Sequence, residues 1–298
     1  MDTAPTASTG STETWSCLQQ WWTAVDTAGF GFYGNATGML ATVMDTAQNL
    51  PAPDRYLVTA LCSATQASWE RQAGRHQDAA ALDDQARELM RQELPREDTG
   101  LAPDTAEYLQ LLALADATTG RTADTLGENV SGSAQELLYQ GDDVLAALHE
   151  YPFPMELQRM VGTEADNSLW VYCGLHTVRA TIRHSWVSAE VAMAEGNWNE
   201  AQTFGKQAVE LSSHWFSPRH QVKSLLVEAA ATSGLAPEEG RDKAKIAFSA
   251  ARNNKFLPLE WAAAMLLRNL PGEDAAYWDE HIGQLREQLN ERGAYYPE

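Results

Sequence analysis

The sequence VSAEVAMAEGNWNEAQTFGKQAVELS, residues 187–212, contains two helical patterns separated by a short turn. Val187, Val191 and Ala194 recur at the spacing of three and four residues that places apolar side chains on one face of a helix. Gly196 ends this first pattern, because glycine adopts the left-handed conformation of a helix terminus at little cost. Two helices joined by so short a connection pack antiparallel. The stretch therefore predicts a helical hairpin.

The glycine of this turn is followed at fixed distances by small residues, and a similar arrangement occurs at two other places in the chain. The three sets are Gly196, Trp198, Ala201 and Ala208; Gly74, His76, Ala79 and Ala86; and Gly234, Ala244 and Ala251. The first two sets share the same spacing throughout, and the third keeps only the seven-residue gap between its alanines. Small residues at these positions let the backbones of neighbouring helices approach closely.

This pattern resembles the tetratricopeptide repeat (TPR) in degenerate form. The segments SPRHQVKS and PLEWAAAMLL, in the C-terminal part of the chain, also resemble pieces of uncharacterised TPR-type proteins from actinobacteria. The resemblance implies an all-α fold, a right-handed solenoid of antiparallel helical hairpins whose first helices line a concave face. It implies no known activity.

The chain shows no alternating strand pattern, so we expect one TPR-like domain over residues 12–298, preceded by a disordered tail over 1–11. Helical hairpins are expected over 12–140 and C-terminal repeats over 168–298. The last helix, about Glu273 to Arg292, would cap the exposed end of the solenoid.

Two further features are expected inside this domain, a hairpin turn and an irregular insertion. Gly120 is expected at the turn of a further hairpin, whose first helix starts with a capping box from Asp104 to Glu107. Gly141–Asn167 is expected to be an irregular insertion, because the prolines in YPFP, residues 151–154, bar the preceding residues from helical geometry.

Charge and cysteine content limit the partners and the compartment. The net charge of −20 argues against nucleic acid, whose phosphates require clustered Lys and Arg, and against anionic membrane surfaces. Cys17, Cys62 and Cys173 are odd in number and far apart, which favours a reducing compartment. The start of the chain has no pattern of a signal peptide, and no stretch has the length of a membrane span. We therefore expect a cytoplasmic protein.

Catalytic, metal and cofactor motifs are weak or missing. GFGFYG, residues 29–34, matches the glycine pattern of dinucleotide sites, but no strand precedes it. His176 and His184 lie two helical turns apart, too far for one ion. The adjacent acidic pairs, such as Asp83 and Asp84, point in different directions on a helix and are expected to face solvent. We expect no catalytic residue, metal or cofactor.

One candidate binding set lies in the segment SPRHQVK, residues 217–223. Arg219 and Lys223 are four residues apart and share a face in the first turns of a helix, whose free N–H groups favour anions. Together with His220 they could form a clamp for a carboxylate or phosphate. The alternative is that these residues pair with acidic residues of neighbouring helices.

A second candidate set lies on the helix that leads into the quoted stretch. Arg179 and Arg183 share one face of this helix. In the register of the resemblance, the concave surface would include Arg183, Trp186 and Glu190, and Arg71 in the first repeat. Trp186 could equally belong to the core.

These sets give two functional hypotheses. The first is a non-enzymatic scaffold or regulator that binds a peptide or a helix of a partner protein in a concave groove. The second is a small-ligand sensor or an enzyme with an anion-binding pocket around Arg219, His220 and Lys223. The first predicts a continuous groove, and the second predicts a pocket on which these three side chains converge.

Overall fold

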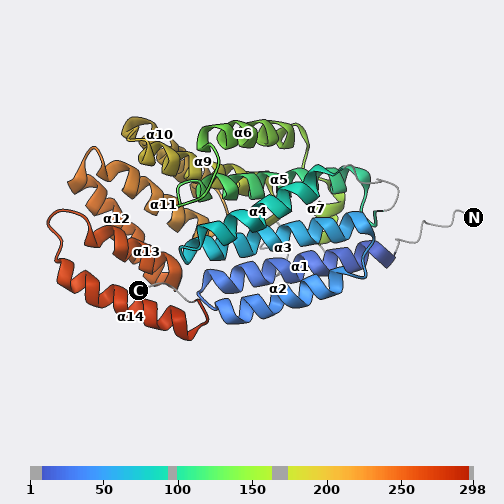
Figure 1. Cartoon of the computed structure of the whole chain (residues 1–298), viewed down its shortest axis with the longest axis horizontal. Coiled ribbons are helices and arrows are strands. Elements are labelled where there is room, and N and C mark those ends of the chain that lie inside the picture. Colours follow the sequence, from blue (N-terminus) through green and yellow to red (C-terminus); the bar gives the residue numbers. More distant parts are fainter. Residues whose placement is uncertain (1–8, 93–98, 163–173, 295–298) are drawn as a thin grey trace, which may run out of the picture.

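The computed structural model of the chain describes residues 9–92, 99–162 and 174–294, and in these ranges it contains 13 helices and no strand. The predicted all-α class is confirmed (Figure 1). The helices are α1 (Thr9–Gly29), α2 (Tyr33–Ala47), α3 (Ala52–Gln72), α4 (His76–Arg91), α5 (Pro103–Asp124), α6 (Ala134–Glu150), α7 (Met155–Gly162), α9 (Thr177–Ala194), α10 (Trp198–Ser213), α11 (Pro218–Ser233), α12 (Pro237–Asn253), α13 (Leu257–Arg268) and α14 (Ala275–Glu291).

The helices contact one another in a regular order that fits a helical repeat. Most helices pack against the next helix in the chain. In addition α1, α3, α5, α9, α11 and α13, which we call the inner helices, each pack against the next member of this series. Side chains that lie on one face of successive inner helices are thereby brought to a common surface.

The predicted turn glycines and small residues explain how the helices approach. Gly74 and Gly196 have positive φ values of 76° and 78° and follow the ends of α3 and α9. The alanines of the three predicted sets are fully buried between helices: Ala79, Ala86, Ala201, Ala208, Ala244 and Ala251. The hairpin predicted from residues 187–212 corresponds to α9 and α10, which pack together.

Gly120 does not form a turn, which corrects the prediction for this region. It lies inside α5, and a Cβ there would overlap the carboxylate of Asp83 and come within 2.9 Å of Arg71 Nη2. The glycine therefore makes room for side chains of neighbouring helices. The predicted capping box at Asp104 is also wrong, because α5 begins at Pro103 after Ala102, without a side-chain cap.

The predicted irregular insertion is helical over most of its described length. Gly141 lies within α6, where a Cβ would come 2.8 Å from Nε2 of His184 on α9, so this glycine permits close packing. YPFP, residues 151–154, is non-helical as predicted, and α7 follows it. Residues 163–167 of the predicted insertion lie outside the described residues.

The two ends of the chain differ little from prediction. Helix α1 begins at Thr9, so residues 9–11 of the predicted tail are helical, and residues 1–8 lie outside the described part. The predicted last helix corresponds to α14, whose N-cap Asp274 accepts hydrogen bonds from two backbone N–H groups.

The loop between α1 and α2, together with the start of α2, meets the C-terminal end of α14. The backbone N–H of Gly34 donates to the carbonyl of Arg292 at 2.8 Å, and Nη1 of Arg292 donates to the carbonyl of Phe30 at 2.8 Å. Gly34 and Gly293 face each other so closely that a Cβ on Gly293 would lie 2.8 Å from the Cα of Gly34. We call this contact of Phe30, Gly34, Arg292 and Gly293 the seam; Figure 1 shows the junction of α1 and α2 beside the end of α14.

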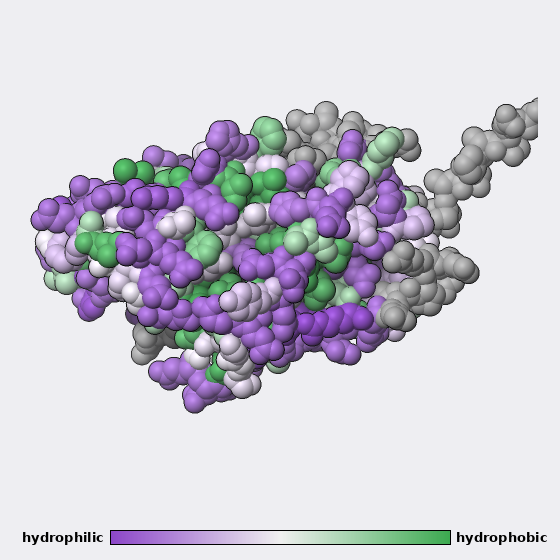
Figure 2. Space-filling view, turned by 90° about the horizontal axis from the view of Figure 1, so that it is seen from above, coloured by the Kyte–Doolittle hydropathy of each residue, from purple (hydrophilic) through white to green (hydrophobic). Residues whose placement is uncertain are grey.

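Hydrophilic residues cover most of the face shown in Figure 2, with apolar residues in smaller groups between them. Among the described residues, no helix is both long enough and apolar enough to cross a membrane.

Candidate functional site

The inner helices surround a pocket with a volume of about 440 Å³. Helices α3, α5, α9, α11 and α13 supply most of its walls, and α4 adds His76. Of the eight predicted binding residues, seven line this pocket: Arg71, Arg183, Trp186, Glu190, Arg219, His220 and Lys223. The two candidate sets, which the sequence analysis treated as alternatives, thus belong to one site.

Helical spacing explains why α9 and α11 present these side chains together. Arg183, Trp186 and Glu190 follow one another at three and four residues, so they lie along one face of α9. Arg219 and Lys223 stand in the same relation on α11. Because α9 and α11 are neighbouring inner helices in contact, their two faces meet at the pocket.

Trp186 joins the two candidate sets through three contacts with α11. Its indole Nε1–H donates to Oγ of Ser224 at 2.8 Å, and its ring stacks on the imidazole of His220 with centroids 5.4 Å apart. Nζ of Lys223 lies 5.9 Å from the ring centroid of Trp186 and 3.1 Å from Oε1 of Glu190. Lys223 therefore lies in the pocket wall, where its charge is partly neutralised by Glu190.

His220 is buried and lies close to several arginines. Burial, and then the charges of Arg179, Arg219 and Arg183, hold its pKa well below the usual range. Its Nδ1 is 2.7 Å from Oγ of Ser217, the N-cap residue of α11. His220 lines the pocket together with Arg219 and Lys223, but its neutral imidazole adds no positive charge to the predicted clamp.

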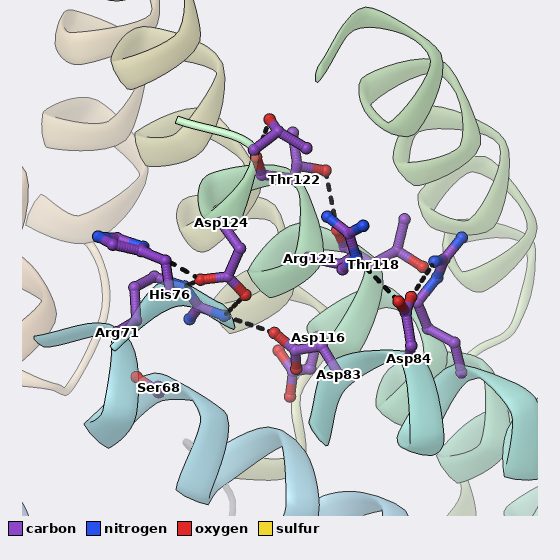
Figure 3. Close-up of polar contacts among 12 residues, drawn as sticks. Ser68, Arg71, His76, Asp83, Asp84, Asp116, Thr118, Arg121, Thr122 and Asp124 are labelled. Atoms are coloured by element: carbon purple, nitrogen blue, oxygen red, sulfur yellow. Dashed lines mark hydrogen bonds and ion pairs between the residues drawn. The ribbon is translucent and has the colours of Figure 1, made fainter. Parts of the chain in front are cut away.

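Arg71 is held by two buried carboxylates from different helices (Figure 3). Its Nη2 donates to Oδ2 of Asp83 at 2.5 Å, and its Nε donates to Oδ1 of Asp124 at 2.7 Å. Nδ1 of His76 lies 3.3 Å from the same Asp124 oxygen. Burial raises the pKa of Asp83, and the adjacent guanidinium of Arg71 opposes this effect by stabilising the carboxylate. This cluster fixes the position of Arg71 at the pocket wall.

Asp116 holds the two arginines of α9 in different ways. Nη2 of Arg179 donates to one carboxylate oxygen, and Nε of Arg179 donates to the carbonyl of Gly174 at 2.7 Å. Arg179 is 4% exposed and is absent from the pocket lining, so the prediction that it binds a ligand is not supported by its position. Nε of Arg183 lies 3.2 Å from the other oxygen of Asp116, and burial lowers the pKa of Arg183 to about 10.

Arg183 and Arg219 keep donor capacity that the described residues do not use. Nε of Arg183 and Nε of Arg219 are both buried atoms without a hydrogen-bond partner in the described part of the chain. The aliphatic part of Arg219 lies against Gly29 at the end of α1, where a Cβ would come 3.0 Å from its Cδ. Arg183 is paired with Asp116 through its Nε, whereas Arg219 makes no hydrogen bond or ion pair with another described residue. The remaining N–H groups of these two guanidinium groups are the donors left for an acceptor that enters the pocket.

The carboxylates behind the pocket wall were not predicted from the sequence. Asp83 was expected to face solvent together with Asp84, yet it is 1% exposed and bound to Arg71. Asp116, Gly120 and Asp124 are spaced by four residues, which places them on one face of α5. Two acidic residues that flank a glycine at this spacing, on one face of the helix, are the signal that could have identified them.

Within the described residues, no group of three or more His, Cys, Asp or Glu side chains is arranged to hold a metal ion. No known protein family, curated protein or solved structure matches the chain. Function must therefore be inferred from the pocket itself.

Proposed function

We propose that the chain is a non-enzymatic recognition protein that binds a ligand with an anionic group in the pocket between its inner helices. In this proposal the helices form a right-handed solenoid of antiparallel hairpins, related to TPR proteins of the kind found in actinobacteria, and the pocket is its concave face. The buried free thiols of Cys17 and Cys62 support a reducing compartment, for which we propose the cytoplasm.

One observation carries the proposal, namely the concentration of positive charge at the pocket. Arg71, Arg183, Arg219 and Lys223 line it, whereas Glu190 is the one acidic residue among its described lining residues. The protein as a whole carries a net charge of −20. The carboxylates of Asp83, Asp124 and Asp116 partly neutralise Arg71 and Arg183 from behind this lining, so it is the N–H groups of the lining residues that favour an anion over a cation. Guanidinium groups are suited to this role because they bind carboxylates through paired N–H donors.

The pair of His76 and Asp124 at the pocket is the one feature of the described residues that favours an enzyme, and it does so less strongly than the arginines favour binding. His76 lies beside Asp124, a pairing that orients catalytic histidines in hydrolases. However, Asp124 mainly accepts hydrogen bonds from Arg71, and no hydrogen bond joins His76 to the pocket hydroxyl of Ser68 in the described structure. The Ser68 oxygen instead accepts from Nε2 of Gln72 at 3.4 Å. We therefore propose binding rather than catalysis.

A peptide or a helix of a partner protein is the second candidate ligand. It is favoured by the regular row of Arg183, Trp186 and Glu190 along α9, which could contact successive residues of a bound segment. Such a partner would still have to present an acidic residue or a C-terminal carboxylate to the arginines.

The proposal can be tested by thermal unfolding of the full chain with matched probes of opposite charge. 2-Naphthoate and acetylated hexaglutamate amide are the anions, and 2-naphthylmethylamine and acetylated hexalysine amide are the cations. A ligand that binds only the folded state raises Tm by an amount that increases with the ratio of its concentration to its Kd. We expect at least one anion to raise Tm, and neither cation to do so.

Two variants locate the effect. Arg219→Gln removes a pocket charge, and Arg268→Gln removes a surface charge that pairs with Asp279 outside the pocket. The Tm increase should be lost in Arg219→Gln and kept in Arg268→Gln. The proposal fails if neither anion raises Tm, or if the increase survives in Arg219→Gln unchanged.

A further inference from the structure

The pocket walls are of two chemical kinds. One wall, from α3, α9 and α11, carries the four cationic side chains. The other wall is apolar. It is formed by α13 and the end of α5, which contribute Ala123, Leu126, Pro258, Leu259 and Ala262. Trp186 and Trp261 also line the pocket. A ligand that satisfies both kinds of wall must have a charged end and an apolar body.

Leu126 indicates that the apolar wall is available for contact. It is one of the large hydrophobic residues that are exposed, with 40% of its surface accessible, although it lies at the pocket. Contact of an apolar ligand with such a side chain removes hydrocarbon surface from water and stabilises the complex.

The free donor capacity at the cationic wall fits a single compact anionic group. Arg71 already binds two carboxylates, and Lys223 is paired with Glu190. Arg219 makes no hydrogen bond or ion pair with another described residue, Arg183 is ion-paired only with Asp116, and both arginines lie close enough to His220 to affect its titration. One carboxylate can accept from two guanidinium groups at once.

The negative charge of Glu190 in the same lining opposes a second or third acidic group on the ligand. This disfavours a polyacidic segment, which would bring several carboxylates into the pocket.

The size of the pocket also argues against a long ligand. A volume of about 440 Å³ falls within the range of about 300–1,000 Å³ that is typical of small-molecule sites. An extended peptide advances about 3.3 Å per residue and needs a groove that continues across several repeats. Here the seam joins the start of α2 and the loop before it to the end of α14, and Arg219 lies against Gly29 of α1. The surface formed by the inner helices is therefore closed into a pocket and does not continue as an open groove for a long ligand.

We infer that the ligand is a small amphipathic monocarboxylate, whose carboxylate lies between Arg183 and Arg219 and whose apolar or aromatic body packs against α13 and the end of α5. This inference rests on the proposed function, because it specifies the anion that the pocket binds. It predicts that both the charge and the apolar body of the ligand contribute to affinity.

Isothermal titration calorimetry with four probes separates these contributions. 2-Naphthoate has both features, 2-naphthalenemethanol has the body without the charge, acetate has the charge without the body, and acetylated hexaglutamate amide is the polyacidic peptide. We expect 2-naphthoate to bind roughly 10- to 100-fold more tightly than each of the other three. This is the range expected when 2-naphthalenemethanol lacks the charge-assisted hydrogen bonds and acetate lacks the buried apolar body.

Variants on the two walls complete the test. Arg219→Gln should weaken binding of 2-naphthoate by roughly tenfold or more, and Ala262→Asp should do the same by placing a charge on the apolar wall. Arg183→Gln repeats the test of the cationic wall should Arg219→Gln not fold, and Leu259→Asn repeats that of the apolar wall. Arg268→Gln should bind as the wild type does.

The outcomes distinguish this inference from the proposed function. If hexaglutamate binds more tightly than 2-naphthoate and its binding requires Arg219, the anion-binding function holds and the ligand class is wrong. Equal affinity for 2-naphthoate and acetate would also overturn the ligand class, because the apolar wall would then contribute nothing. If no anion binds in a manner that depends on Arg183 or Arg219, both the inference and the proposed function fail.

Discussion

Gly120 of α5 lies directly against the carboxylate of Asp83 on α4, and no side chain larger than hydrogen fits at residue 120 without displacing it. Asp83 in turn binds Arg71 of α3 at the wall of the pocket. A single glycine therefore allows α3, α4 and α5 to share one buried ion cluster. Its position in mid-helix, where glycine is normally unfavourable, is explained by this packing.

Replacing Gly120 with alanine should destabilise the protein. The added methyl group would force Asp83 and Arg71 apart, and overpacking of this kind costs about 1–3 kcal/mol. Chemical denaturation followed by circular dichroism measures the free energy of unfolding.

Gly38 on α2 provides the matched control, because it is also helical but has no neighbouring atom within 4 Å of an added Cβ. Gly38→Ala should stabilise the protein by about 0.5–1 kcal/mol, the normal effect in a helix. The packing explanation would be wrong if both substitutions changed stability in the same direction.

His220 should make the stability depend on pH in the acidic range. Its pKa in the folded protein lies well below the unfolded value of about 6.5, so the unfolded state binds the proton first as the pH falls. The contribution of His220 is therefore constant above pH 6.5 and decreases below it by about 1.4 kcal/mol per pH unit. Denaturation curves measured between pH 5 and pH 8 give this slope.

His220→Phe keeps an aromatic ring beside Trp186 but cannot titrate, so its stability should decrease less steeply below pH 6.5. His176 and His184, whose pKa values are also lowered by burial, are present in both proteins and cancel in the difference. Identical slopes for the wild type and the variant would contradict the assignment of a neutral, buried His220.

The seam should contribute to stability at the ends of the array. Gly293→Ala would place a methyl group against the Cα of Gly34, in a residue with φ of 84°. Gly196→Ala has the same kind of backbone strain at φ of 78°, but no atom lies within 4 Å of its added Cβ. Backbone strain should lower the free energy of unfolding of each variant by about 1–2 kcal/mol. The decrease should be larger for Gly293→Ala, because the added methyl group also separates the two sides of the seam.

Hydrogen exchange provides a second measurement of the seam. Amides of α14 should exchange faster in Gly293→Ala, whereas Gly196→Ala should leave them close to the wild type. Unchanged protection of α14 in Gly293→Ala would mean that the seam does not hold this helix.

The sequence was sufficient to predict the all-α class and the two helices α9 and α10 that pack together, because turn glycines and buried alanines are local signals. It also identified Arg183, Trp186 and Lys223, because helical spacing shows which side chains share a face. It could not show that the faces of α9 and α11 meet at one pocket, since that depends on contacts between helices.

The errors at Gly120, Gly141 and Asp83 have a common cause. Each residue acts through a partner on another helix, and such a partner is not visible in a local pattern. Gly120 makes room for Asp83, and Gly141 makes room for His184. Without those partners, a glycine within a helical pattern is most simply interpreted as a break and an aspartate as a solvent-facing residue.

The most direct test of anion binding at the pocket is the affinity of 2-naphthoate for the wild type and for Arg183→Glu, measured by calorimetry, with Arg268→Glu as the control for net charge. Charge reversal at Arg183 should weaken binding by roughly 30-fold or more, because an attractive contact becomes repulsive, and Arg268→Glu should have little effect. Equal affinity of the wild type and Arg183→Glu would contradict the proposal that this pocket is the binding site.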